Sequence, residues 1–280
     1  MVWLDIGGDM NKKIYVVKAS GDKELFNKFK IISSLVRAGT PIDIAEEVAD
    51  EVEEKVYNGI STREIYNICL KILIKKYPRF AAKYDLKRSI MILGPSGFPF
   101  EKFFANILRE YGYDVENNLI FKGKCVEHEI DVFAKKNGKR IMVECKHHSE
   151  PGIYVDLKVI LYTYARFLDL SSYFNEVWVV SNTRFSKEAV RYGKCMNVKL
   201  IGWRYPKNMG LEKMIEDKKL YPITILKSVK YDVIKRLVEK NIILVRDLRD
   251  KTIEEISMET GLGYRIVEKI LNEAIAILKV

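Results

Sequence analysis

The sequence predicts an α/β protein of three parts, in which a central mixed sheet stands between two helical segments. Apolar residues recur at helical spacing before about residue 91 and after about residue 222, whereas strand-like and helix-like runs alternate between them. The chain has 280 residues, of which 48% are hydrophobic, so it can form more than one core. We therefore expect domains over 12–91, 98–222 and 223–280.

The charge balance points to a polyanionic partner. Lys and Arg number 48 and Asp and Glu 38, which gives a formal charge of +10. All three parts are positive, so no basic tail explains the excess. Nucleic acid is the expected partner, and the alternative is a basic protein with no such partner.

Cysteine usage and hydropathy indicate the compartment. The four cysteines are widely spaced and form no CxxC pair, which is typical of a reducing environment and excludes a zinc ribbon. The N-terminal residues do not form the apolar core of a signal peptide, and no apolar run is long enough to span a bilayer. These features predict a cytoplasmic protein without a membrane partner.

The first part combines a short strand with helices. We expect a strand over 14–17, a turn over 19–22 in a hairpin-like lead, and amphipathic helices over about 26–36 and 44–56. A third helix begins at Ser61, because a hydroxyl there and Glu64 three residues later form a capping box, and it ends before Pro78.

In this part Val17-Lys18-Ala19-Ser20-Gly21 is followed by Glu24, Phe26 and Lys30, a pattern that resembles the ATP-cone, a nucleotide-binding regulatory domain. The family's usual lead is Lys-Arg-Asp-Gly, which here reads Lys18-Ala19-Ser20-Gly21. The resemblance implies ATP or dATP as an effector, with Lys18 and Lys30 as point charges on the phosphates and Gly21 allowing close backbone approach. The alternative is a solvated lysine pair beside a turn glycine. The likeness also rests on these residues: Val17, Glu24, Phe26, Ile31, Ile60, Ser61, Thr62, Arg63, Glu64, Ile65, Ala81, Tyr84 and Arg88.

The central part follows a linker over 93–99, which lacks the Lys and hydroxyl residue of a phosphate-binding loop. Its pattern predicts a mixed sheet with helices on both faces. We expect helices over 101–111, 154–168 and 186–195, and strands over 113–121, 127–136, 139–147, 177–180 and 198–203.

A hairpin in this part brings two carboxylates together. Asn137-Gly138 between two strand-like runs predicts a two-residue type I′ turn, in which facing residues have numbers that sum to 275. Asp131 then faces Glu144 and should touch it, while Glu129 faces Lys146. Because like charges directly opposite are destabilising, a divalent cation would relieve the pair, and carboxylates suit Mg²⁺ or Mn²⁺.

Lys146 completes this set. It shares a face with Glu144, so its ammonium can reach a water or a scissile phosphate and stabilise charge in the transition state. A Glu129–Lys146 salt bridge beside a chance acid pair is the alternative. We expect structural or solvent-facing roles for His128, His147 and His148 rather than metal binding, with His147 on the core face.

Asp131, then Glu144-Cys145-Lys146 after the hairpin, resembles the D…ExK pattern of the PD-(D/E)XK nucleases, most closely the Mrr-type restriction endonuclease branch. The resemblance implies Asp131, Glu144 and Lys146 as catalytic residues. It also implies Mg²⁺ held by both acids and the Cys145 carbonyl. Glu101 matches a further acid of that branch, and its alternative is a glutamate favoured by a helix N-terminus.

The last part is helical, with expected helices over 226–238 and 264–278 and short helical pieces at 245–248 and 252–258. Gly261-Leu262-Gly263 before the final helix resembles a helix-hairpin-helix DNA-binding module. The resemblance implies that amides near Gly261 and Gly263 bind a phosphate, with Arg265 and Lys269 extending the contact. A plain helical bundle with a turn glycine is the alternative.

Together these features predict a metal-dependent DNA endonuclease that ATP or dATP regulates. A non-catalytic, nucleotide-responsive DNA-binding regulator is the rival from another class, and a junction resolvase or RNA nuclease on the same core is a third option. The residues do not fix the oligomeric state, and a homodimer is one option.

Overall fold

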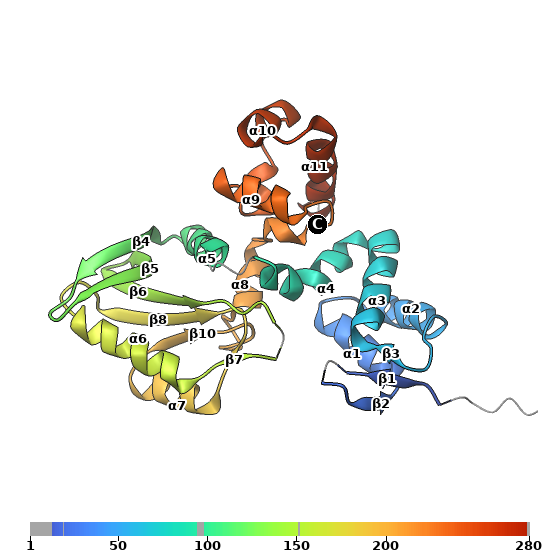
Figure 1. Cartoon of the computed structure of the whole chain (residues 1–280), viewed down its shortest axis with the longest axis horizontal. Coiled ribbons are helices and arrows are strands. Elements are labelled where there is room, and N and C mark those ends of the chain that lie inside the picture. The colour runs from blue at the N-terminus through green and yellow to red at the C-terminus, as the bar shows by residue number, and fades with distance from the viewer. Residues whose placement is uncertain (1–12, 19, 94–97, 151, 279–280) are drawn as a thin grey trace, which may run out of the picture. The chain divides into compact units, whose positions relative to one another are not determined.

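The chain divides into two units, one ending at Asp85 and the other beginning at Leu86. The computed structural model describes residues 13–18, 20–93, 98–150 and 152–278. The first unit corresponds to the blue and teal ribbon of Figure 1, and the second runs from green to red.

The first unit is built on a three-stranded sheet with the order β2-β1-β3. Strand β1 (Tyr15–Val17) pairs antiparallel with β2 (Lys23–Leu25) and parallel with β3 (Ile60–Ser61). Gly21, at a φ of +87°, closes the turn between β1 and β2, and its amide donates to the Lys18 carbonyl. The predicted hairpin-like lead is therefore confirmed.

Helices α1 (Lys28–Arg37), α2 (Ile42–Glu53) and α3 (Thr62–Lys76) accompany this sheet. The predicted capping box is present, because Ser61 accepts the Glu64 amide while the Glu64 carboxylate accepts the Ser61 amide. Apolar faces of the three helices form one core, which contains Leu35, Ala45, Val48, Val52, Cys69 and Leu73.

Helix α4 (Pro78–Met91) was not expected as a separate element. Pro78 ends the preceding helical run but also starts α4, which is the position in a helix that tolerates proline. Leu86 and Ile90 are buried, and the Ser89 carbonyl accepts a hydrogen bond from Thr224 in the second unit. The boundary between the two units therefore lies at residues 85–86 and not at the expected residue 91, because the end of α4 packs within the second unit.

The second unit contains a five-stranded mixed sheet with the order β10-β8-β6-β5-β4. Strands β4, β5 and β6 form an antiparallel meander, and β6, β8 and β10 run parallel. This is the expected mixed sheet. The strands are β4 (Asp114–Lys122), β5 (Glu127–Lys136), β6 (Lys139–Lys146), β8 (Glu176–Ser181) and β10 (Lys199–Ile201).

Four helices accompany this sheet: α5 (Phe98–Glu110), α6 (Leu157–Asp169), α7 (Lys187–Cys195) and α8 (Leu211–Lys218). Helix α5 contacts β4 and β5, whereas α6 and α7 pack together and contact β8 and β10 respectively (Figure 1). The α6 and α7 side of the core includes Phe133, Met142, Ile160, Val179 and Ala189.

Sequence-based expectations for the helices and short strands of this unit need correction. The helix expected from residue 154 begins at Leu157, because Asp156 caps it and Tyr154–Val155 instead form strand β7. Strand β7 pairs with β9 (Arg184–Phe185), which is too short to show an alternating pattern. Helix α8 was not expected, because a run of eight residues is a weak periodic signal.

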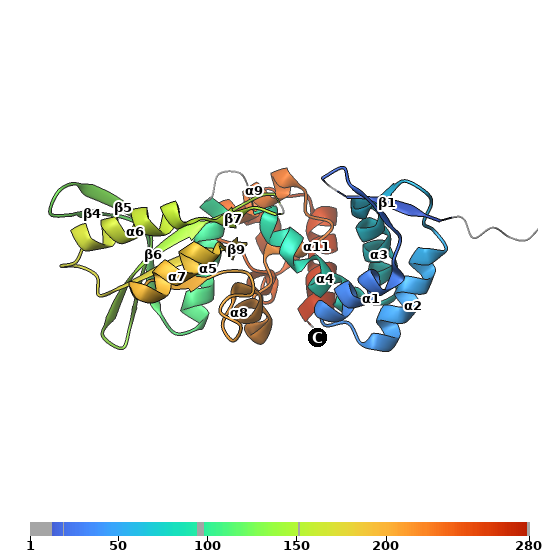
Figure 2. The same ribbon diagram turned by 90° about the horizontal axis from the view of Figure 1, so that it is seen from below.

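The C-terminal helices belong to the second unit (Figure 2). They are η1 (Ile223–Ile225), α9 (Tyr231–Glu239), η2 (Val245–Leu248), α10 (Ile253–Thr260) and α11 (Tyr264–Leu278). The helix expected from residue 226 starts only at Tyr231, because Leu226 is a buried extended residue after η1. An ion pair between Arg246 and Glu110 at 2.5 Å links η2 to α5.

Hydropathy along the helices is moderate. Within the ranges that the structure describes, no helix has the length and apolar character required to cross a bilayer.

Candidate active site

The β5–β6 hairpin positions the site. Asn137 and Gly138 both have positive φ, at 49° and 77°, as a type I′ turn requires. The ladder runs from Lys136–Lys139 to Val132–Val143, and each pair sums to 275. The predicted register is confirmed for these pairs, so Asp131 and Glu144 follow directly at the end of the ladder.

Beyond Val132 the two strands no longer pair through their backbones. Oδ2 of Asp131 instead accepts a hydrogen bond from the Cys145 amide at 2.7 Å. Because the strands separate here, the expected pairing of Glu129 with Lys146 is wrong. Lys146 instead pairs with Glu144 on its own strand, with 2.6 Å between Nζ and Oε1. The end of the hairpin thus opens around the Asp131 carboxylate.

Glu144 is the buried centre of the site, with 4% of its surface exposed. Lys146 contacts one carboxylate oxygen, and Nη1 of Arg166 contacts the other at 2.5 Å. Arg166 comes from α6, is itself buried, and also donates from Nη2 to the Glu129 carbonyl. Two cations from different elements therefore hold one carboxylate.

Burial and the charge of Glu144 both act on Asp131. Burial, and then the negative charge of Glu144, raise the pKa of Asp131 to about 7, although the Cys145 amide opposes this rise. Burial would lower the pKa of Lys146, but Glu144 and Asp131 outweigh it and raise that pKa above its ordinary value. The site therefore holds Lys146 charged beside Asp131, whose ionisation the Glu144 charge disfavours.

Glu101 lies in the first turn of α5 at the margin of this site. Burial raises its pKa, and Glu144 and Glu129 add to the rise, so the structure places Glu101 within the field of the other acids. Asn118 is 3.5 Å from Glu101 and 3.4 Å from Glu129, which are long hydrogen bonds. Asn118 has a φ of 55°, a region that asparagine enters more readily than most residues.

The donor set suits a hard divalent cation. Asp131 offers a half-buried carboxylate whose charge Glu144 disfavours, and the backbone at Cys145 lies within hydrogen-bond distance of it. The described part of the chain contains no group of three His, Cys, Asp or Glu side chains arranged for a metal. Mg²⁺ does not require one, because it commonly takes one or two carboxylates and completes its shell with water and substrate oxygens.

The side chains of His147 and His128 have structural partners, whereas Nε2 of His148 is buried without a hydrogen-bond partner among the described residues. His147 Nε2 lies 2.9 Å from the Ile90 carbonyl, and its ring packs 5.4 Å from that of Phe100. His128 pairs with Asp169 at 2.8 Å. The expected core position of His147 is confirmed by these contacts.

The first unit brings Lys18 and Lys30 together on one carboxylate. Both ammonium groups pair with Oε2 of Glu24, at 2.8 and 2.7 Å. The hydrogen bond and charge of Glu24 raise the pKa of Lys18 above its ordinary value. The two lysines therefore lie close enough to share a phosphate, and Glu24 holds them.

Near the C-terminus the two glycines have different roles. Gly261 ends α10 at a φ of 67°, and its carbonyl accepts from Arg236 at 3.0 Å. Gly263 directly precedes α11, whose first residues include the exposed Arg265 and Lys269. These two side chains are four residues apart, so they lie on one side of the helix.

Three family models match the chain in sequence order. They are an ATP cone domain over 14–90, a restriction endonuclease over 93–203, and an AF1548-like, C-terminal region over 221–278. The chain thus carries an ATP-cone region followed by a restriction-endonuclease-like region. The predicted ATP-cone and Mrr-type resemblances are confirmed, whereas the helix-hairpin-helix resemblance stays a prediction.

One sequence and one solved structure, both of proteins without an assigned function, are similar to more than half of this chain. An uncharacterized protein of Archaeoglobus fulgidus is 43% identical over 171 residues, which are 61% of this chain and 97% of that protein. The chain belongs to the same family. The crystal structure of the protein of unknown function AF1548 is 39% identical with a TM-score of 0.60, over 66% of this chain and all of that one.

A further similarity concerns a smaller stretch of sequence. The transcriptional repressor NrdR of Alkaliphilus metalliredigens is 31% identical over 83 residues, which cover 25% of this chain and 54% of that protein.

Arg166 is the site residue that the sequence analysis missed. It lies within the apolar pattern of α6, where a buried charge requires a partner. An arginine among the apolar positions of a predicted helix therefore indicates a buried ion pair. Its partner could not be identified, because the pairing joins residues 22 apart through the tertiary fold.

Proposed function

We propose that the chain is a Mg²⁺- or Mn²⁺-dependent DNA endonuclease whose activity responds to ATP or dATP. The observation that carries this proposal is the cluster of Asp131, Glu144 and Lys146 at the open end of one hairpin. This cluster lies within the stretch that resembles restriction endonucleases. Two acids and a lysine are groups that suit phosphodiester hydrolysis when a cation is present.

Asp131, Glu144 and the Cys145 carbonyl would hold the cation. When bound, it would supply Lewis-acid polarisation of the scissile phosphate. Lys146 would orient the attacking water and stabilise the charge that develops on the phosphate, since its ammonium is charged and 38% of its side chain is exposed. Glu101 would bind water at the margin of the site.

Arg166 would keep Glu144 in place. Its guanidinium makes one contact to a Glu144 oxygen and one to the Glu129 backbone, so it fixes both strand segments that border Asp131. Arg166 is thus a positioning residue, because it acts through Glu144.

DNA and nucleotide binding complete the proposal. The net charge of +10 favours a nucleic acid, and the exposed Arg265 and Lys269 next to Gly263 suit phosphate contacts that do not read sequence. The Lys18–Glu24–Lys30 cluster supports nucleotide binding in the first unit. A DNA-binding regulator without catalytic activity is less well supported, because such a protein would not need Asp131, Glu144 and Lys146 to lie together.

A cleavage assay tests the proposal. Duplex, branched and single-stranded DNA, and RNA, are incubated with the full chain in Mg²⁺, in Mn²⁺ and in EDTA. We expect cation-dependent cleavage of DNA, lost in Asp131→Asn and in Glu144→Gln, both of which should stay folded. Cleavage of RNA alone would favour an RNA nuclease, and cleavage that survives both substitutions would place the active site elsewhere.

A further inference from the structure

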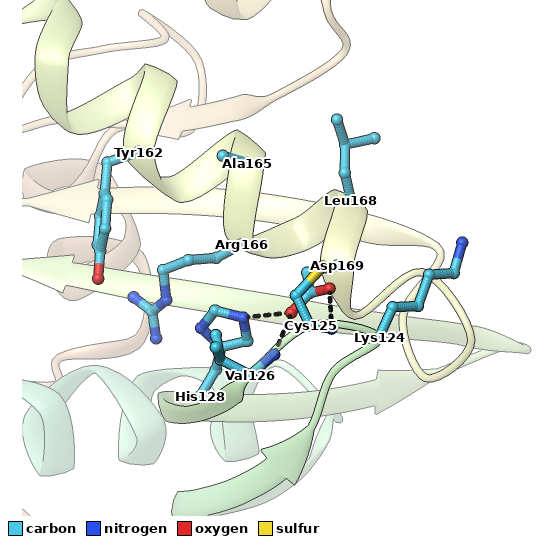
Figure 3. Close-up of a pocket in the computed structure, with 9 residues that line it drawn as sticks. All are labelled: Lys124, Cys125, Val126, His128, Tyr162, Ala165, Arg166, Leu168 and Asp169. Atoms are coloured by element: carbon cyan, nitrogen blue, oxygen red, sulfur yellow. Dashed lines mark hydrogen bonds and ion pairs between the residues drawn. The ribbon is translucent and has the colours of Figure 1, made fainter.

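An open pocket of about 490 Å³ adjoins the candidate active site and shares Arg166 with it (Figure 3). The loop between β4 and β5 forms one wall and α6 forms the other. Lys124, Val126 and His128 come from the loop and the start of β5, and Tyr162, Arg166 and Asp169 from α6. The volume lies within the usual range for small-molecule sites.

The loop wall is built around Asp169. Its carboxylate accepts the Cys125 amide at 2.8 Å and pairs with His128 at 2.8 Å (Figure 3). A Cβ on Gly123 would lie 2.1 Å from Oδ2 of Asp169, so glycine is required for the loop to close on this carboxylate. The wall is thus preorganised, and hydrogen bonds to both Asp169 oxygens offset its repulsion of an anionic ligand.

Cys125 does not make this cluster a second catalytic centre. Its thiol is hydrogen-bonded to Asp169, and this contact raises the pKa of Cys125 above its ordinary value. A thiol held in this way is a poor nucleophile at neutral pH. The cluster is therefore a supporting structure for the pocket.

The ligand-facing groups suit a flat ring attached to a phosphate. Tyr162 is 63% exposed, and the Arg166 guanidinium lies 5.5 Å from its ring centroid. In Figure 3, Tyr162 and Lys124 stand at opposite ends of the pocket, with Arg166 and His128 between them. An exposed aromatic face binds a base by stacking, and the exposed Lys124 at the other end of the pocket can attract a phosphate.

We propose that this pocket binds the base of a substrate nucleotide next to the scissile phosphodiester, by stacking on Tyr162. The inference deepens the proposed function and rests on it. Arg166 contacts Glu144 and also lines the pocket, so the pocket and the candidate catalytic carboxylates are separated by one side chain, and a strand at those carboxylates would be within reach of it. The base must leave its duplex stack to enter, so single-stranded, branched or mismatched DNA is the preferred substrate class.

The test compares two strands of equal charge in EDTA, so that neither is cut. One strand has about six thymidines and the other has abasic residues at the same positions. We expect Tyr162→Ala to weaken binding of the thymidine strand about 5- to 150-fold, the range for loss of one stacked base. The same substitution should leave binding of the abasic strand unchanged.

Two matched variants serve as controls. Tyr162→Phe keeps the ring and should bind the thymidine strand as the wild type does. Leu161→Ala removes an exposed residue of the same helix that does not line the pocket, so it should bind both strands normally. Circular dichroism verifies that each variant is folded.

The outcomes separate the two proposals. If Tyr162→Ala weakens binding of both strands equally, or of neither, the pocket assignment is overturned. The nuclease proposal then still stands, provided that the wild type cleaves DNA. A wild type that neither binds nor cleaves any nucleic acid overturns both.

Discussion

Asp131 combines burial with a negatively charged neighbour, so its ionisation opposes folding. Its pKa rises from 3.8 to about 7 in the folded chain. The folded state therefore binds a proton that the unfolded state has already lost. Between about pH 4 and 7 this group reduces stability as the pH rises.

Asp131→Asn should remove this dependence while keeping an oxygen for the Cys145 amide. The quantity to compare is the free energy of unfolding in EDTA, wild type minus variant. As the pH rises from about 4 to 7, this difference should fall by up to about 1.4 kcal/mol per pH unit. Urea unfolding at several pH values measures it. Asp114→Asn, an exposed site on β4, is the matched control. A constant difference between wild type and variant would contradict the assigned burial of the charge.

Lys146→Ala should lower cleavage turnover about 10²- to 10³-fold, because it removes a cation that acts in the transition state. Mg²⁺ affinity, measured by calorimetry, should change little, since Arg166 still compensates Glu144. Lys139→Ala, at the other end of the same strand, should behave as the wild type. Near-normal turnover in Lys146→Ala would exclude this lysine from catalysis.

At the scale of elements, α6 is joined to the hairpin by the buried Arg166–Glu144 pair. Arg166→Met leaves Glu144 with Lys146 alone and the Glu129 carbonyl without this donor. We expect a loss of about 3 kcal/mol in the free energy of unfolding, because removing one partner of a buried pair is costly.

The double variant Arg166→Met, Glu144→Gln should recover part of that loss, since no buried charge then lacks a partner. Urea denaturation gives the coupling energy. Arg191→Met, an exposed arginine on α7, provides the control. Additive effects of Arg166→Met and Glu144→Gln would show that the two side chains do not interact.

The N-terminal turns of α11 carry the proposed phosphate contacts. Arg265→Ala with Lys269→Ala should weaken DNA binding about equally for all sequences, and should lower the slope of log affinity against log salt by about 1 per lost contact. Fluorescence anisotropy at several salt concentrations measures both. Lys235→Ala with Lys240→Ala removes the same charge from exposed positions of the α9 region. If both pairs lower the slope equally, the effect reflects net charge alone.

At the scale of the whole molecule, Lys18 and Lys30 lie in the first unit and the candidate catalytic residues lie in the second. Lys18→Ala should weaken ATP binding and abolish any ATP effect on cleavage, while basal cleavage stays intact. A non-hydrolysable analogue should act as ATP does, since the described residues around Lys18 and Lys30 form no acid cluster that could hold a catalytic metal.

Glu24→Gln should have the opposite effect on nucleotide binding to Lys18→Ala. Glu24 holds both lysines, so a phosphate must displace it, and neutralising it should strengthen ATP and dATP binding several-fold. Calorimetry with the full chain measures both variants, with Lys23→Ala as the exposed control. Absence of binding by the wild type would show that the Lys18-Ala19-Ser20-Gly21 lead does not support nucleotide binding.

The sequence by itself determined the features that depend on nearby residues. The Asn137-Gly138 turn defined the hairpin register, and the strand ends of β5 follow from it. The capping box at Ser61 and the bounds of the final helix were equally readable, because caps and helical periodicity act within a few residues.

Only the tertiary structure decided how distant residues meet. It replaced the Glu129–Lys146 pair by a Lys146–Glu144 contact, because the hairpin opens where the Asp131 side chain takes the Cys145 amide. It also brought Arg166 from α6 onto Glu144. Neither result follows from spacing along the chain, since a buried charge selects its partner by what lies nearest after the helix has packed on the sheet.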